Sequence, residues 1–146
     1  MTDYFTLEPE SSPTWGEHTE VDTSVHPPIV STLHLEFVEW LGDDLLWTYP
    51  SYVVTENLAA KLAEASLSGF EFRPVEVTVD PHVIEDGETL DLQKFRWLHI
   101  TGTPGRDDIG ITDKGRIVVS ETALTTLRQG NLEYCEIEQY NPPEVS

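Results

Sequence analysis

Five histidines, one cysteine and 27 acidic side chains are the residues of this 146-residue chain whose types suit catalysis or metal binding. His82 lies in a polar loop with Asp80, Glu85 and Asp86, and an imidazole among carboxylates is a possible metal-ligand set. His99 lies in a predicted strand, where a histidine can serve as a general base. A small metal-binding protein or enzyme that uses His82 or His99 with nearby acids is therefore an alternative hypothesis.

The motifs of common catalytic sites do not occur in the chain. The glycines of residues 102–115 match neither the dinucleotide nor the P-loop spacing, and no Gly-x-Ser-x-Gly elbow occurs. Cys135 lies in a predicted strand beside Glu136, and acidic surroundings raise a thiol pKa, so we interpret it as a buried structural thiol. We predict no catalytic residue, no metal ligand and no cofactor, and expect a protein without enzymatic activity.

Charge is the strongest compositional signal. The formal net charge is −19, and residues 1–60 contain eleven acids but no Lys or Arg. Such a field repels nucleic acids and anionic membranes and attracts basic partners, although it also serves plain solubility. The single cysteine excludes an internal disulfide, and the first 13 residues lack the basic and apolar segments of a secretory signal. We therefore expect a cytoplasmic protein that binds neither nucleic acid nor membrane.

One segment, residues 39–50, combines two Trp, one Tyr and three acids around a predicted turn. Tyr and Trp commonly anchor protein interfaces, and acids around them select a basic partner. For Trp40 or Trp47 taken alone, we favour a place in the core. A second acidic turn follows at residues 107–108, and we expect the acids of both turns to be solvated. The predicted partner-binding residues are Glu39, Asp43, Asp44, Trp47, Tyr49, Asp107 and Asp108.

The elements that must position these residues follow from apolar periodicity. Alternating apolar residues predict strands at 33–37, 70–79 and 95–100, and a polar loop spans 80–93. Thr55 followed by Glu56 is typical of a helix start, with a capping hydroxyl and an acid at the positive end of the helix dipole. Helices are predicted near 56–66 and 121–130.

The strand–helix–strand pattern occurs twice. Residues 52–73 align without a gap on residues 117–138, with six of 22 positions identical, and Thr55 aligns with Ser120. We interpret this as an internal repeat within one domain. The predicted fold is a single α+β domain, 1–146, with two pseudo-repeated β-α-β units at 52–79 and 117–140, a mixed sheet, and a loosely ordered N-terminal arm at 1–28.

The chain resembles immunity-protein families of bacterial polymorphic toxin systems over about residues 33–140. The segments that carry the resemblance are 42–56, 67–72, 95–98, 107–110 and 117–121. It implies an inhibitor that binds a toxin domain and has no activity of its own. Some such proteins carry paired Cys-x-x-Cys motifs, which this chain lacks, so a zinc-bearing subfamily is excluded and the toxin stays open. The lead hypothesis is an acidic immunity protein with a basic toxin partner. A third reading is an acidic nucleic-acid mimic.

Overall fold

The computed structural model describes residues 3–11, 13–25, 28–85 and 94–140. Within these residues the chain forms a mixed α+β fold of helices and several sheets, as predicted. No helix in the described part of the chain is long and apolar enough to cross a membrane.

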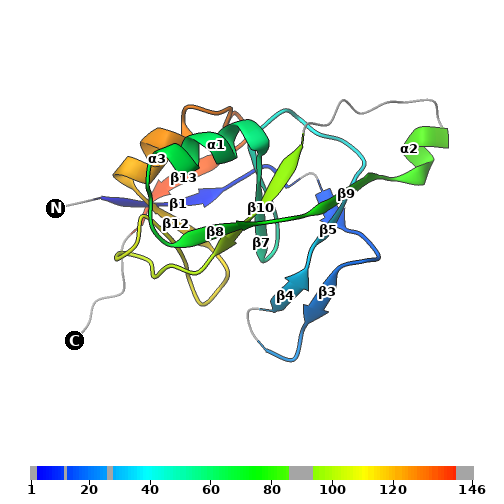
Figure 1. The fold of residues 1–146 in the computed structure, drawn as a ribbon, viewed down its shortest axis with the longest axis horizontal. Coiled ribbons are helices and arrows are strands. Elements are labelled where there is room, and N and C mark those ends of the chain that lie inside the picture. Colours follow the sequence, from blue (N-terminus) through cyan, green and yellow to red (C-terminus); the bar gives the residue numbers. More distant parts are fainter. Residues whose placement is uncertain (1–2, 12, 26–27, 86–93, 141–146) are drawn as a thin grey trace.

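Two four-stranded sheets share one spatial arrangement of strands, although the third strand of the order comes last along the chain in one sheet and first in the other (Figure 1). The first contains, in spatial order, β6 (Leu45–Thr48), β7 (Ser51–Thr55), β10 (Phe95–Ile100) and β8 (Phe70–Arg73). The second contains, in the equivalent order, β11 (Ile109–Ile111), β12 (Ile117–Ser120), β1 (Tyr4–Glu8) and β13 (Glu136–Gln139). All neighbouring strands in both sheets are antiparallel. We call these two sheets and their helices the body.

In each sheet, a helix directly follows the second strand of the spatial order. Helix α1 (Glu56–Glu64) follows β7 directly, and α3 (Glu121–Leu127) follows β12. The two helices pack against each other on one side of the sheets, at the top of Figure 1. In each unit the strand after the helix pairs with a third strand, β10 or β1, which separates it from the strand before the helix.

The N-terminal segment is not the loosely ordered arm that its prolines and glycine suggested. Strand β1 lies between β12 and β13 in the second sheet, with Phe5 opposite Val119 and Leu7 opposite Ile137. Leu7 is buried in the core. The expectation of a loose arm was wrong because this strand fills a place that only the distant C-terminal unit creates; residues 1–2, 12 and 26–27 lie outside the described part.

The first β-α-β unit is shorter than predicted. The apolar alternation over residues 70–79 belongs to two strands, because Pro74 separates β8 from β9 (Glu76–Val79). Proline cannot donate the backbone hydrogen bond that a continuous central strand needs. Strand β9 instead pairs in parallel with β5 (His34–Phe37) in another sheet. The predicted loop at 80–93 begins with helix α2 (Pro81–Glu85), and residues 86–93 lie outside the described part.

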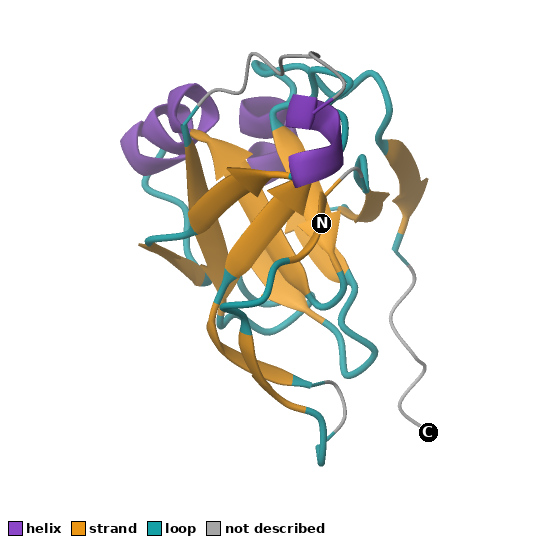
Figure 2. Cartoon of the chain, turned by 90° about the vertical axis from the view of Figure 1, so that its right-hand side faces the viewer, coloured by secondary structure: helices purple, strands orange, loops and turns teal. Residues whose placement is uncertain are grey.

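The remaining strands form a smaller layer, which we call the extension. Its mixed three-stranded sheet has the order β2 (Pro13–Trp15), β5 and β9. A two-stranded hairpin of β3 (Glu20–Asp22) and β4 (Ile29–Thr32) projects away from the rest of the molecule (Figure 2). The predicted strand at 33–37 is β5, and the mixed sheet that the sequence suggested is present here.

Two apolar clusters hold the layers together. The first lies between the helices and the two body sheets and includes Leu62 and Leu127, both with no exposed surface. The second lies between the extension and β7, β6 and β10, and includes Phe37 and Trp97. Strand β7 contributes to both clusters through alternate residues and is buried along its whole length.

Candidate partner interface

Asp44, expected at the surface, is a structural side chain of the body. Its Oδ1 accepts a hydrogen bond from Thr55 Oγ1 at 2.7 Å, and its Oδ2 accepts from the backbone N–H of Asn131 at 2.6 Å. Thr55 Oγ1 in turn accepts from the N–H of Leu58 and caps α1. Asp44 therefore joins the start of α1 to the loop after α3.

Asp108 makes the reciprocal connection in the second unit. Its Oδ1 accepts from Ser120 Oγ at 2.9 Å, and Ser120 caps α3 by accepting from the N–H of Ala123. The other oxygen, Oδ2, accepts from the backbone N–H of Ser68 at 3.1 Å, in the segment after α1. Each unit thus contributes a carboxylate that holds its own helix start and the segment that follows the other helix.

The acids that precede this pair are also not free surface charges. Asp43 has no exposed surface, and its Oδ2 accepts from the N–H of Tyr134 at 2.8 Å. Burial raises the pKa of Asp43, and the nearby Glu10 carboxylate acts in the same direction. Asp107 is half-buried and accepts from the N–H of Thr103 at 2.7 Å.

The expectation that these four aspartates are solvated was wrong for Asp43, which has no exposed surface; Asp44, Asp107 and Asp108 stay partly exposed, but their carboxylates accept hydrogen bonds within the chain. Asp44 and Asp108 directly precede a body strand, and Asp43 and Asp107 lie two residues before it, in loops whose N–H groups lack a sheet partner. A buried N–H needs an acceptor, and a carboxylate supplies a strong one. Asp43 is therefore removed from the predicted interface, whereas Asp44, Asp107 and Asp108 have a structural role and are only partly exposed.

The aromatic residues of the predicted interface lie together. Tyr49 is 38% exposed, and its ring meets the edge of the Trp47 ring at a centroid distance of 6.2 Å. Trp47 is half-buried and stacks on Tyr52 at 5.7 Å. Tyr52 is buried, its hydroxyl donates to the carbonyl of Gly115, and burial raises its pKa to about 12. Trp47 therefore belongs partly to the core, whereas Tyr49 is available at the surface; Glu39 is also exposed.

An apolar cleft of about 380 Å³ lies between the β3–β4 hairpin and the body. Val25 and Ile29 on the hairpin side are 42% and 60% exposed. Trp97 and Leu98 of β10 line the other side and are buried. Pro50, the residue after Tyr49, also lines the cleft, so the exposed aromatic residue and the cleft adjoin along the chain.

Charge is divided sharply between the two regions. All eight Lys and Arg lie within residues 61–73 and 94–128, and the extension strands contain none. Three arginines of the body form ion pairs with body acids: Arg73 with Glu71, Arg96 with Glu56, and Arg116 with Glu8. In the described strands and turns of the extension, the side chains that can carry a positive charge are histidines. Its exposed acids face solvent without a nearby Lys or Arg in the chain segments that form it.

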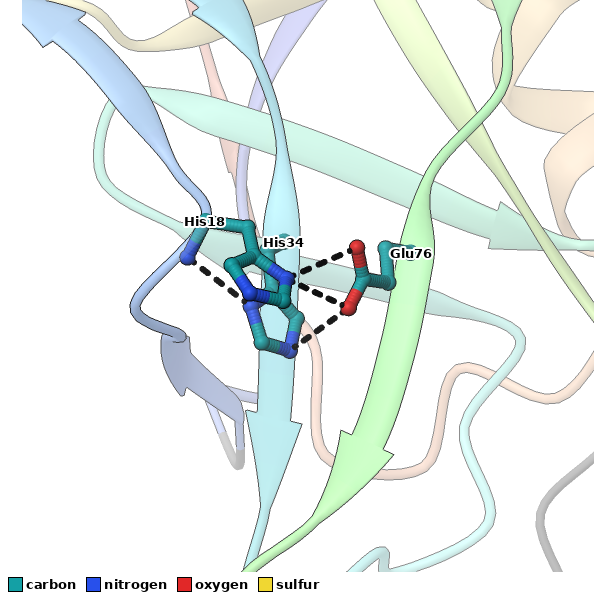
Figure 3. Close-up of side chains that lie close together, drawn as sticks. All are labelled: His18, His34 and Glu76. Atoms are coloured by element: carbon teal, nitrogen blue, oxygen red, sulfur yellow. Dashed lines mark hydrogen bonds and ion pairs between the residues drawn. The ribbon is translucent and has the colours of Figure 1, made fainter.

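A histidine cluster in the extension brings His18, His34 and Glu76 together (Figure 3). His18 Nδ1 lies 2.8 Å from Glu76 Oε2, and His34 Nε2 lies 3.6 Å from the same oxygen. The two rings stack at 4.9 Å. The ring nitrogens and the carboxylate oxygen that could bind a metal all lie within 4.8 Å of one another. In the described part of the chain, these two imidazoles and one carboxylate are the group whose residue types match a zinc site.

The hydrogen bonds of the cluster show how its protons are placed. His34 Nδ1 accepts from the backbone N–H of His18 at 3.1 Å, so the neutral ring carries its proton on Nε2, which lies 2.7 Å from Thr78 Oγ1. A metal ligated by Nε2 would need that proton removed and Nδ1 protonated, against the His18 N–H. The arrangement is therefore that of a hydrogen-bonded clamp, which fastens the turn after β2 to β5 and β9.

Gly16 is needed for this clamp. Its N–H donates to the His34 carbonyl at 2.8 Å, and a Cβ at this position would lie 2.2 Å from the His34 ring. No spacing rule could have found the cluster from the sequence, because His18, His34 and Glu76 meet only through the pairing of β5 with β9 and the turn that follows β2.

The residues of the alternative metal or enzyme hypothesis do not meet. His82 is exposed in α2, near Asp80, whereas His99 lies in β10 with its Nδ1 3.2 Å from Glu71. Burial, with Arg73, lowers the pKa of His99. The side chain of Glu85 and all of Asp86 lie outside the described part. Cys135 is half-buried, and burial raises its pKa to about 12, in keeping with a structural thiol.

Comparison with protein-family models and with curated proteins finds no match for this chain.

Proposed function

We propose that this chain is an acidic binding protein that neutralises a bacterial toxin domain by direct binding to a basic surface of that domain. The observation that carries the proposal is the segregation of charge, because every Lys and Arg lies outside the extension strands while acids line them. A surface of one sign accelerates encounter with a partner of the opposite sign and disfavours partners of the same sign.

Exposed apolar side chains beside this acidic region support the same proposal. Tyr49, Val25 and Ile29 are all more than a third exposed and lie on or next to one cleft. Charge gives rate and selectivity, whereas burial of such side chains at the centre of an interface supplies most of the binding free energy. The resemblance of the chain to immunity proteins makes a toxin domain the partner of choice.

The deciding experiment begins with the gene beside the one that encodes this chain. If that gene encodes a toxin domain, co-expression of this chain should restore growth of cells that produce the toxin, and the purified proteins should form a complex. Tyr49→Ala should weaken that complex about tenfold or more, whereas Tyr134→Ala, at a similarly exposed residue elsewhere, should change it little. Absence of both rescue and complex would overturn the proposal.

A further inference from the structure

The cleft between the β3–β4 hairpin and the body has the form of a built receptor for a side chain. Its base consists of Tyr52, Leu98 and Trp97, which are at most 4% exposed and belong to the two apolar clusters. Its volume, about 380 Å³, falls at the lower end of the range of ligand pockets in proteins. The base is therefore rigid, and no rearrangement of the core is needed to form the cleft.

The hairpin side of the cleft is apolar yet exposed. Ile29 is 60% exposed, and Val25 is 42% exposed. A two-stranded hairpin gains little stability from its own pairing, so exposed aliphatic residues on it are a cost to the free protein. Val30, which is buried against the second apolar cluster, anchors the hairpin to the molecule. Ile29 and Val25 remain exposed, and a molecule bound in the cleft would bury them.

A negative charge stands directly beside this apolar lip. Asp22 is paired opposite Ile29 across the hairpin, and directly opposite residues of antiparallel strands project from the same face. The Asp22 carboxylate accepts from the N–H and hydroxyl of Ser24, and these hydrogen bonds lower its pKa, so it stays ionised at neutral pH. The extension strands supply no Lys or Arg to neutralise it.

We propose that this cleft binds a protein segment that inserts a large apolar side chain between the hairpin and β10 and places a neighbouring Lys or Arg against Asp22. The occupant is a segment of a basic protein partner; charge complementarity selects it over a small apolar ligand or a second copy of this equally acidic chain. The inference rests on the proposed function, since it assigns the part of the molecule that contacts the toxin.

The test uses the full chain and the protein encoded by the neighbouring gene, with the catalytic residue of its toxin domain inactivated; a neighbouring gene that encodes no toxin domain would count against both proposals. Ile29→Ser should weaken the complex at least about tenfold, mainly through faster dissociation. Tyr134→Ser is the matched control, because Tyr134 is 48% exposed and does not line the cleft, and it should change the affinity less than about twofold. Both variants should unfold at the wild-type urea concentration, since each alters an exposed side chain.

A charge variant tests the second half of the proposal. Asp22→Asn keeps the acceptor for Ser24 but removes the charge, and it should slow association several-fold at low ionic strength and have little effect at high ionic strength. If the toxin domain binds and Ile29→Ser behaves like Tyr134→Ser, the cleft is not the receptor, although the proposed function stands. If the wild-type chain does not bind the toxin domain at all, both proposals are overturned.

Discussion

The body and the extension use their carboxylates in opposite ways. In the body, Asp44 and Asp108 each accept hydrogen bonds from a helix-capping hydroxyl and from the segment after the other helix. In the extension, acids such as Glu17 are exposed, and the strands hold no Lys or Arg. Asp44 and Asp108 therefore stabilise the body across its two units, whereas the bonded acids of the extension, such as Glu76 and Asp22, make local contacts and stay exposed. Sequence position alone does not distinguish the two uses. The difference is set by whether a backbone N–H group that lacks a sheet partner lies within reach of the carboxylate.

The largest expected difference between the regions lies in local opening. Amides of β7, buried along its whole length, should exchange only on global unfolding, because both apolar clusters cover the strand. Amides of the β3–β4 hairpin should exchange at least about 100-fold faster, since the hairpin contacts the core through buried Val30 and partly buried Val21 alone among its apolar strand residues. Amide hydrogen exchange followed by NMR measures both. Equal protection would mean that hairpin and body form one cooperative unit.

Removal of the reciprocal carboxylates should destabilise the body strongly. Asp44→Ala and Asp108→Ala should each lower the free energy of unfolding by about 2 kcal/mol, because each leaves a capping hydroxyl and a backbone N–H without their charged acceptor. Glu17→Ala in the extension should change it by less than about 0.5 kcal/mol. Urea unfolding is the measurement. Similar losses for all three variants would erase the distinction between the regions.

Asp43 should behave differently from its neighbour Asp44. Its pKa is raised by burial, so the folded state binds the proton more tightly than the unfolded state, and this contribution to stability falls as pH rises above the unfolded pKa. Asp43→Asn keeps an acceptor for the Tyr134 N–H and removes a buried charge near Glu10. At pH 7 the variant should be about 1 kcal/mol more stable than wild type, with the gain vanishing in acid. A loss of stability at pH 7 would contradict this account of the burial.

The smallest expected effect is at the exposed ion pair of the extension. In this pair, the hydrogen bond between His18 and Glu76 raises the pKa of His18. The stabilisation that accompanies this shift is therefore complete below the unfolded histidine pKa and is lost as pH rises through the folded pKa. Titration of the His18 ring protons by NMR should show the raised pKa, and Glu76→Gln should remove most of the shift while the fold stays intact, because Glu76 is its main cause and Glu17 adds to it. An unchanged titration in that variant would place the cause elsewhere.

Local patterns in the sequence predicted several features that the structure contains. Both helices begin where a hydroxyl residue precedes Glu, since Thr55 and Ser120 cap N–H groups only three residues away. The repeated segments 52–73 and 117–138 both contain strand, helix and strand, in equivalent places of two sheets. The mixed α+β class followed from the alternation of these patterns. Such features depend on contacts between neighbours along the chain, which a single sequence displays directly.

Tertiary structure alone decided the features that depend on distant segments. In the tertiary structure β1 lies between β12 and β13, β9 pairs in a different sheet from β8, and His18, His34 and Glu76 lie next to one another. It also buried Asp43 and left Tyr49 exposed, although both lie within one acidic and aromatic segment. The sequence by itself determined the net charge, the helix starts and the repeat. Strand pairing and burial set the rest, because they bring together residues whose separation along the chain has no characteristic spacing.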